Sequence, residues 1–485
     1  MSTIGIPAGE QTAPEDRISI PQRLAYGLGA LVNNLLGAAI GVMAIVLNLG
    51  LGMNPAVVGL LMALPRLTDA LTDPIMGFVS DQSKTRWGRR RPFIFVGAIA
   101  AGLVFALLWQ LPEGHSQTFY FWFFLCGSIL FYLAYTVFAT PWVALGYEMT
   151  PDYNERTRLM GTANFMGQIA WVLAPWFYWL MENKRFFDDS VSGARGLAIA
   201  VGVFAALVGI VPAIVCRERL GKAEAGQESI VSKDRMEAVM RQVKAFLKGF
   251  LITIRFRPFL KLCAATFLVF NGFMLVSAFS SYVIIFYVYS GDQSAGSRLM
   301  GWNGTVSAIA TFMVIPLITW ISTRTGKRTA FFIAIGISIF GYALKYFCYS
   351  QTTPMLLLVS TPFIAFGLGG LFTLMGSMIA DVCDFDELET GRRREGMFGS
   401  IFWWVVKLGM ALALALSGVL LNATGFDVEL GGDQAERTLF LMRFFDVAIP
   451  IVASAVAIWL VASYTITEDK ARAIRSQLEA RRGKI

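Results

Sequence analysis

The stretch FIFVGAIAAGLVFALLWQL, residues 93–111, carries no charged side chain and is long enough, as a helix, to cross a hydrocarbon layer about 30 Å thick. A second such run covers Leu24–Gly50, and others follow along the whole chain. Of the 485 residues, 56% are hydrophobic and 15% are charged, whereas soluble proteins average about 45–50% and 25%. The sequence therefore predicts an all-α membrane protein, excludes a secreted or nucleic-acid-binding protein, and argues against a soluble enzyme.

The apolar segments predict twelve transmembrane helices, at residues 22–50, 55–82, 92–112, 117–148, 159–183, 194–216, 256–289, 297–323, 328–349, 352–382, 396–423 and 438–465. With the amino terminus inside, most of the 41 lysines and arginines fall in inner segments. The basic residues on the outer side are Lys184, Arg185, Arg195, Arg298, Lys345, Arg437 and Arg443. This bias follows the positive-inside rule and predicts a multi-pass protein of the cytoplasmic (inner) membrane with both termini cytosolic. The net charge of +8 is then a consequence of topology.

The chain is predicted to consist of two six-helix halves, residues 1–216 and 256–465. They are joined by a cytosolic linker, 217–255, with an amphipathic stretch at Asp234–Phe250, and are followed by a cytosolic tail, 466–485. Two short motifs of the first half recur in the second half at nearly the same distance along the sequence. Gly88-Arg-Arg-Arg matches Gly326-Lys-Arg, and the segment 144–148 matches 380–384. Duplicated halves are typical of transporters with a binding site at the midplane, the major facilitator fold among them.

The second span contains PRLTDALTDP, residues 65–74, with two carboxylates at membrane depth. Asp69 and Asp73 are four residues apart, so they lie on one helix face. At about 1.5 Å per residue, Asp73 lies roughly 12–16 Å from the cytosolic interface and Asp69 lies deeper. Charges at such depth mark ion or substrate paths, and a carboxylate pair suits Na⁺ or a shared proton. The structural alternative is a salt bridge that fixes helix packing. Its basic partner would be Arg66 or Lys407, the two basic residues that lie inside predicted spans.

Uncharged polar residues also cluster at mid-depth, where they could bind the hydroxyl groups of a polyol beside aromatic rings. Packing between helices is the alternative for each of them. The polar residues are Asn33, Asn34, Asn164, Gln168, Asn271, Thr373 and Ser377, and the aromatic residues are Trp171, Trp403 and Trp404. The predicted substrate site consists of Lys407 and, from this cluster, Asn33, Asn34, Asn164, Gln168, Asn271, Thr373 and Trp403.

Catalytic chemistry finds no support in the sequence. The single histidine, His115, lies in a predicted outer loop, and the five cysteines have no metal-ligand spacing. No nucleophile and base occur together at membrane depth. We therefore expect no enzyme activity and no cofactor besides a coupling ion, Na⁺ or H⁺.

These motifs together resemble a known family. Arg66-x-x-Asp69-Ala-x-x-Asp73-Pro-Ile-Met-Gly77, with Arg86-Trp-Gly-Arg89 after it, is similar to the helix II signature of the glycoside–pentoside–hexuronide:cation symporters of the major facilitator superfamily. The segments Tyr26–Ala30, Ala380–Asp384 and Val406–Gly409 match as well. The resemblance implies a cation site at Asp69 and Asp73, with Thr136 matching the family's threonine ligand and Thr72 next to the site. It also implies that Lys407 lies close to the carboxylates.

The sugar-recognition pattern departs from that family. The family's helix I aspartate, helix IV aspartate and helix V arginine are Asn34, Ala139 and Asn164 here. These positions recognise galactosides in the family's best-known member. Because they differ here, the resemblance does not imply that this chain binds galactosides. A vertebrate lysolipid transporter resembles the same family and shares the paired aspartates, which keeps an amphiphilic substrate open.

The sequence thus predicts a monomeric secondary transporter that couples Na⁺ or H⁺ entry to uptake of a sugar-like solute by alternating access within the bilayer. The alternatives are a cation-coupled carrier of lysolipids or other amphiphiles and a proton-driven exporter. Charged residues at the cytosolic helix ends are predicted to form gating latches in the outward-open state: Asp81, Arg89, Arg90, Glu148, Arg156, Asp381 and Asp384.

Overall fold

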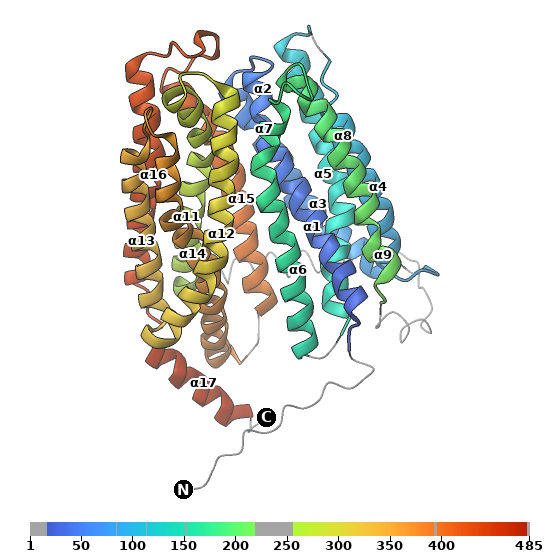
Figure 1. The fold of residues 1–485 in the computed structure, drawn as a ribbon. Helices are drawn as coiled ribbons and strands as arrows, with labels where there is room; N and C mark the ends of the chain where they lie inside the picture. Colours follow the sequence, from blue (N-terminus) through green and yellow to red (C-terminus); the bar gives the residue numbers. More distant parts are fainter. Residues whose placement is uncertain are drawn as a thin grey trace. The chain divides into compact units, whose positions relative to one another are not determined.

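The computed structural model describes residues 17–83, 85–112, 114–150, 153–218, 256–391 and 395–482. In these ranges all regular secondary structure is helical, which confirms the all-α prediction (Figure 1). The longer helices are α1 (Ile20–Met43), α3 (Pro55–Gln82), α4 (Arg91–Leu108), α5 (Gln117–Glu148), α6 (Tyr153–Leu173), α8 (Ser190–Gly209), α11 (Arg257–Tyr282), α12 (Gln293–Thr325), α13 (Lys327–Cys348), α14 (Leu357–Thr390), α15 (Glu395–Ala423), α16 (Glu436–Ala462) and α17 (Glu468–Arg482). The short ones are α2 (Ile45–Leu49), η2 (Ala174–Trp176), α7 (Phe177–Met181), α9 (Val211–Val215), the π-helix η4 (Val283–Val288), η5 (Pro354–Leu356) and η6 (Val428–Leu430).

Ten helical segments among the described residues are long and apolar enough to cross a membrane, and they coincide with ten of the twelve predicted spans. The other two predicted spans contain α3 and α6, which are helical. Residues Pro55–Thr68 of α3 form a shorter apolar helix among the described residues. Asp69, Asp73 and Asp81 follow it in α3, and α6 begins with charged residues. Ionisable residues in a transmembrane helix are typical of helices that line a polar path.

The contacts divide the chain into two compact units, and the first comprises residues 17–43, 71–174 and 191–218 of the described chain. Within it α1 packs along α6, and α4 packs along α5. Helices α4 and α8 meet at Gly102 and Gly202, where a Cβ atom on either residue would collide with the carbonyl oxygen of the other. Small residues at such crossings let helix backbones touch, which is how helices associate in lipid.

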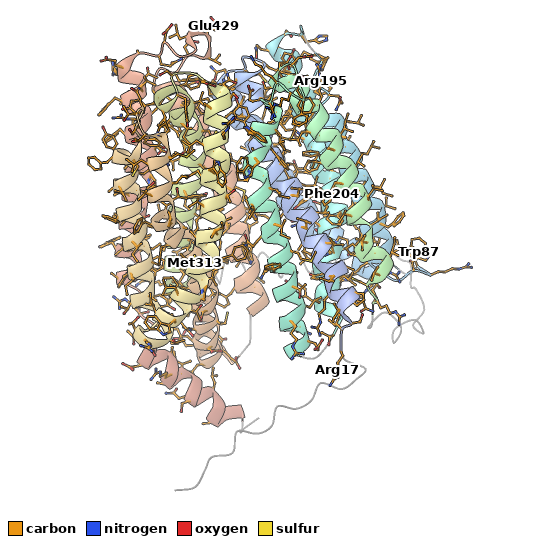
Figure 2. All side chains as sticks on the ribbon, in the orientation of Figure 1. Arg17, Trp87, Arg195, Phe204, Met313 and Glu429 are labelled. Atoms are coloured by element: carbon orange, nitrogen blue, oxygen red, sulfur yellow. The ribbon has the colours of Figure 1, made fainter. Side chains whose placement is uncertain are left out.

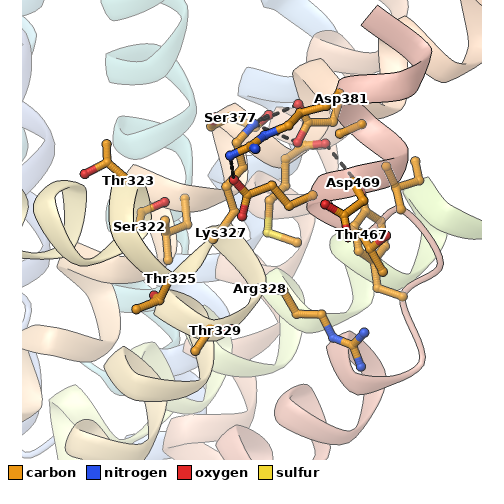
Figure 3. Close-up of a pocket in the computed structure, with 18 of the residues that line it drawn as sticks. Ser322, Thr323, Thr325, Lys327, Arg328, Thr329, Ser377, Asp381, Thr467 and Asp469 are labelled. Carbon is orange, nitrogen blue, oxygen red and sulfur yellow. Dashed lines mark hydrogen bonds and ion pairs between the residues drawn. The ribbon is translucent and has the colours of Figure 1, made fainter.

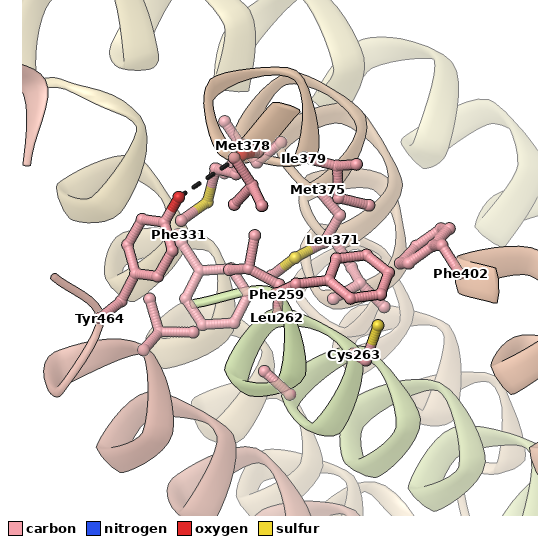
Figure 4. Close-up of a cluster of buried hydrophobic side chains, with 14 of the residues drawn as sticks. Phe259, Leu262, Cys263, Phe331, Leu371, Met375, Met378, Ile379, Phe402 and Tyr464 are labelled. Carbon is pink, nitrogen blue, oxygen red and sulfur yellow. Dashed lines mark hydrogen bonds between the residues drawn. The ribbon is translucent and has the colours of Figure 1, made fainter. Parts of the chain in front are cut away.

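The second unit comprises residues 44–70, 175–190 and the described part of 256–482. Helix α13 lies against α14, and α11 lies against α15 and α16. Its core is a continuous apolar cluster that includes Phe259, Phe331, Leu371 and Met375 (Figure 4). The outer surfaces are apolar as well: Met313 on α12 is 69% exposed, as expected for a side chain that faces lipid (Figure 2).

The carboxyl-terminal tail contributes to this second unit. Helix α17 packs against α14, and its Ile474 and Leu478 are buried in the same apolar cluster. The Lys470 ammonium lies 4.6 Å from the centre of the Phe385 ring. The tail is predicted from sequence only as a charged cytosolic segment, so its docking is a finding of the structure.

Two pieces of the amino-terminal half belong to the second unit by their contacts. Asn48 accepts a hydrogen bond from the Tyr282 hydroxyl at 2.9 Å, and Asn422 donates to Asn54 at 2.6 Å. The indole of Trp176 donates to Thr305 Oγ1 at 2.9 Å. The predicted division into halves around the 217–255 linker stays a prediction, because the amphipathic stretch Asp234–Phe250 lies outside the described residues.

A buried ion pair joins α13 to α16 inside the second unit. Lys345 Nζ lies 2.8 Å from Asp446 Oδ2, and the Tyr349 hydroxyl donates to the same oxygen at 2.7 Å. The sequence analysis counts Lys345 among the basic residues of the outer side, and in the structure this residue is only 7% exposed. The Asp446 carboxylate, three turns into α16, compensates the buried charge.

Candidate functional site

The Asp73 carboxylate lies in a cluster of hydroxyl groups within the first unit. Its Oδ1 accepts a hydrogen bond from Thr136 Oγ1 at 3.1 Å and another from Thr140 Oγ1 at 3.0 Å. The hydroxyls of Thr72 and Thr136 are 3.3 Å apart. Thr136 is 2% exposed, and Asp73 is half-buried. The structure therefore brings together three of the four residues predicted for the cation site, and all their side chains present oxygen atoms.

Helix geometry explains why these groups meet. Thr136 and Thr140 are one turn apart on α5, so both hydroxyls lie on one face of that helix. Gly77, one turn after Asp73, faces the Thr140 methyl group, and a Cβ atom there would make an ordinary van der Waals contact at 3.7 Å. Oxygen ligands of this kind bind hard cations or share a proton with the carboxylate.

The sequence does not single out Thr140. It stands next to Ala139, where the family's helix IV aspartate is missing. The four-residue spacing from Thr136 is the signal that could have found it, because i and i+4 side chains share a helix face.

The remaining ionisable residues of the predicted site are only partly located. The backbone of Asp69 lies in α3, one turn before Asp73, but its side chain is outside the described part of the chain. Arg66 and Lys407 are half-buried on α3 and α15, both in the second unit. Joint coordination by Asp69 and Asp73, and the charge-partner role of Lys407 and Arg66, stay predictions.

The predicted substrate residues of the first unit lie on α1 and α6, which pack together. Asn33 Oδ1 accepts from the Tyr135 hydroxyl at 2.8 Å, and its amide nitrogen is 3.4 Å from Asn34 Oδ1. On α6, Asn164 is exposed and Gln168 is half-buried. Tyr135, which sequence reasoning does not select, precedes Thr136, so α5 carries one polar group near the asparagines and another at Asp73.

Among the predicted substrate residues of the second unit, some side chains pack against neighbouring helices and others are exposed. Asn271 donates to its own helix at Phe267 O, 2.6 Å away, and its side chain packs against Gly409 of α15. Thr373 Oγ1 donates to Gly369 O at 2.6 Å. Trp403 is 56% exposed and stacks on Phe372. The packing alternative thus has direct support at Asn271, whereas Trp403 presents an open aromatic face.

The predicted latch residues of the first unit form one charged network. Arg90 donates to Asp81 Oδ1 at 2.7 Å and to Glu148 Oε1 at 2.6 Å, and Arg89 donates to the same Glu148 oxygen at 2.5 Å. Arg156 instead donates to the Thr150 carbonyl at 3.1 Å. The network joins α3, the start of α4 and the end of α5.

Glu218, which the sequence does not select, caps the start of α4. Its carboxylate accepts from the backbone N–H groups of Arg89, Arg90 and Arg91 at 2.6, 2.8 and 2.9 Å. Gly88 has a φ of 108°, and a Cβ atom there would lie 2.7 Å from the carboxylate. The glycine of the repeated Gly-basic motif is therefore needed for this anion–amide contact.

The second unit repeats the pairing. Lys327 Nζ lies 2.7 Å from both carboxylate oxygens of Asp381, and Asp384 lies one turn further along α14. Arg89 and Lys327 occupy equivalent positions in the two repeats, and each lies at the start of a long helix and pairs with an acid on the next long helix. The acids are not equivalent in the repeat, because matching 144–148 to 380–384 aligns Glu148 with Asp384, whereas Lys327 pairs with Asp381 about one turn earlier.

These observations define a polytopic helical membrane protein with a carboxylate–hydroxyl site inside a transmembrane helix pair. A family model described as MFS/sugar transport protein matches residues 25–468, so the chain belongs to this family of major facilitator transporters. The family comprises membrane transporters rather than enzymes, and the match confirms the resemblance seen in the sequence.

Known relatives and solved structures agree with this assignment. The chain is 24% identical to the glucuronide carrier protein homolog of Escherichia coli, over 95% of each chain. It is 23% identical to the human sodium-dependent lysophosphatidylcholine symporter 1, over 98% of this chain and 90% of the relative. A bacterial homologue of the human lysosomal transporter Spinster, solved inward-facing, has a TM-score of 0.66 at 18% identity, covering 95% of this chain and 99% of the other, which shows the major facilitator fold.

Proposed function

We propose that this protein is a cation-coupled symporter of a neutral, sugar-like solute, with the coupling cation bound at Asp73. The observation that carries the proposal is the pair of α5 hydroxyls bonded to the Asp73 carboxylate at 3.0 and 3.1 Å inside a membrane helix. A carboxylate held by hydroxyls exchanges those contacts for Na⁺ or H⁺ without leaving a charge unpaired. Asp69 and Thr72 belong to the same proposed site, and Lys407 and Arg66 are its proposed charge partners.

The solute class is supported by the amide and hydroxyl groups near this site. The side chains of Asn33, Asn34 and Tyr135 already hydrogen-bond to one another, and asparagine both donates to and accepts from sugar hydroxyls. A relative named for isoprimeverose transport supports a neutral sugar. A relative named as a glucuronide carrier homolog supports only a sugar-like solute, because a glucuronide carries a carboxylate.

Cation binding at Asp73 would raise the affinity for the solute. Solute binding would raise the affinity for the cation by the same factor, because coupling free energies are reciprocal.

Three finer points belong to the proposal. The excess of basic residues in the predicted inner segments supports an arrangement with both termini on the cytosolic side of a cytoplasmic membrane. The protein acts as a monomer that needs no cofactor besides the coupling ion. The charged networks around Arg89 and Lys327 serve as latches during alternating access.

The decisive test is solute-dependent thermal stabilisation of the purified protein in NaCl and in choline chloride, at several pH values. A methyl glycoside should stabilise the wild type more in Na⁺, and Asp73→Asn should remove that difference. A stabilisation that depends on pH but not on Na⁺ would identify H⁺ as the coupling ion. Equal stabilisation of wild type and Asp73→Asn under all conditions would overturn the proposal.

A lysolipid is the second candidate substrate, favoured by one observation. The sodium-dependent lysophosphatidylcholine symporter 1 matches this chain over nearly its whole length. If lysophosphatidylcholine stabilises the protein in a Na⁺-dependent manner and the glycosides do not, the cation site stands and the substrate class changes. A proton-driven exporter would show solute efflux driven by inward H⁺ flow.

A further inference from the structure

A cavity of about 640 Å³ lies within the second unit (Figure 3). Its walls are the end of α12, the start of α13, the middle of α14 and the beginning of the tail. A volume of this size is typical of small-molecule sites. The lining includes Thr373 of the predicted substrate site and the Lys327–Asp381 pair of the proposed latch, but no role follows from them for the cavity as a whole.

Hydroxyl groups dominate the polar lining, and their donors are largely engaged. Thr319, Thr323, Thr325 and Thr373 each donate to a carbonyl of their own helix, at 2.8, 2.8, 3.0 and 2.6 Å. Each hydroxyl oxygen keeps lone pairs that can accept a hydrogen bond. A wall rich in acceptors is complementary to a ligand rich in hydroxyl donors.

The charges in the lining favour a ligand without negative charge. Lys327 is paired with Asp381 at 2.7 Å, and Arg472 is paired with Glu468. The lining contains three cationic residues and four acidic ones, so its formal charge is −1. A phosphate or carboxylate ligand at Lys327 or Arg472 would have to displace an internal carboxylate, and Arg328 donates to the Ala462 carbonyl. A neutral polyol would leave these contacts intact.

The tail forms one wall of the cavity because α17 is anchored beside it. Ile474 and Leu478 are buried in the apolar cluster, and the Tyr464 hydroxyl donates to Met378 O at 3.4 Å. Gly326, with a φ of 83°, lies against Glu468 so closely that a Cβ atom would be 2.5 Å from the carboxylate. A ligand that contacts Ser377 and Thr467 together would therefore hold the tail helix against α14.

We propose that this cavity is a second binding site, specific for neutral polyhydroxylated solutes, and that its occupation stabilises the docked tail helix. The solute class rests on the proposed function, but the existence of the site does not. The site belongs to the end of the unit that carries the Gly326 turn and the tail, which the proposed topology places in the cytosol. Solute released on that side would occupy it.

The test uses the full chain with Asp73→Asn, which removes the proposed cation-dependent site, and methyl β-glucoside and methyl β-xyloside as probes. Binding is measured by calorimetry, and hydrogen exchange reports on α17. We expect binding that is independent of Na⁺ and slower exchange of the α17 amides. Ser377→Phe fills the cavity and should weaken this binding at least tenfold. Ala380→Phe, on the same helix but outside the lining, should leave it within twofold.

Three results would overturn the inference: no glycoside binding to Asp73→Asn, equal losses in Ser377→Phe and Ala380→Phe, or protection of α17 by lysophosphatidylcholine but not by glycosides. Failure of the proposed function would give a different result. The wild type would then show no cation-dependent binding, while the glycoside binding that Ser377→Phe weakens would persist in both the wild type and Asp73→Asn.

Discussion

At the scale of single residues, Thr140 is the group whose role the structure adds to the cation site. Replacing it by valine removes one of two hydroxyls on Asp73 Oδ1 without changing side-chain size. A hydrogen bond to a charged group contributes about 1.5–3 kcal/mol, and 1.4 kcal/mol corresponds to a factor of about ten. We expect Thr140→Val to weaken Na⁺ binding about tenfold, because a ligand oxygen is lost, but to strengthen H⁺ binding, because a hydrogen bond to the ionised carboxylate opposes its protonation. Cation-dependent uptake in proteoliposomes measures both.

Two matched variants test this reading of Thr140. Thr140→Ser keeps the hydroxyl and should restore most of the cation affinity. Thr162→Val removes a hydroxyl that donates only to its own helix, at Arg158 O, and should have no effect. An unchanged cation titration in Thr140→Val would rule out a ligand role for this hydroxyl.

Glu155 is a residue whose contribution to stability should depend on pH. Burial would raise the pKa of its carboxyl, but the Ile18 amide, Arg23 and Arg158 outweigh burial and hold the pKa below its ordinary value. A depressed pKa in the folded state adds stability above the unfolded pKa of about 4.3, and that stability is lost as the pH falls through the folded value. Glu155→Gln should therefore lower the melting temperature at pH 7, with a difference that shrinks below about pH 4.3.

The control for Glu155 is Glu389→Gln, which changes an exposed acid on α14. Melting curves of wild type and both variants between pH 7 and pH 3.5 make the comparison. If the gap between wild type and Glu155→Gln stays constant over this range, the carboxylate is not the stabilising species.

At the scale of elements, glycines decide how closely α3 and α15 approach inside the second unit. A Cβ atom at Gly418 would collide with the Pro55 carbonyl oxygen, and one at Gly59 would lie 2.6 Å from that of Leu414. We expect Gly418→Ala to push the two helices apart. Because Asn54 and Asn422 are hydrogen-bonded nearby, an Asn54→Cys/Asn422→Cys pair should crosslink readily alone and at least fivefold more slowly with Gly418→Ala.

Gly376→Ala serves as the control for the helix crossing, since a Cβ atom at Gly376 meets nothing within 4 Å. Crosslinking should then proceed as in the parent pair. Equal crosslinking rates with Gly418→Ala and Gly376→Ala would show that the glycine contact does not set the distance between α3 and α15.

At the scale of the whole molecule, both halves of the sequence pair a basic residue of the repeated Gly-basic motif with an acid on the next long helix, Arg89 with Glu148 and Lys327 with Asp381. Each pair holds the start of one helix to the later part of the next. We expect Arg89→Gln combined with Lys327→Gln to change the balance between inward- and outward-facing states, measured by cysteine accessibility. Arg185→Gln, in an exposed loop, is the control. An unchanged balance would remove the latch role from both networks.

Hydropathy and i, i+4 spacing predict the membrane class, the helical fold and the position of Asp73, because both are local properties of the chain. The family follows from the resemblance of the motif around Asp69 and Asp73. The sequence could not show that Thr140 bonds to Asp73, that Glu218 caps α4 from 127 residues away, or that Lys345 is buried with Asp446. Nor could it show the docked tail and the hydroxyl-lined cavity beside it. These features depend on contacts between segments far apart in sequence, and only the packing of helices brings such segments together.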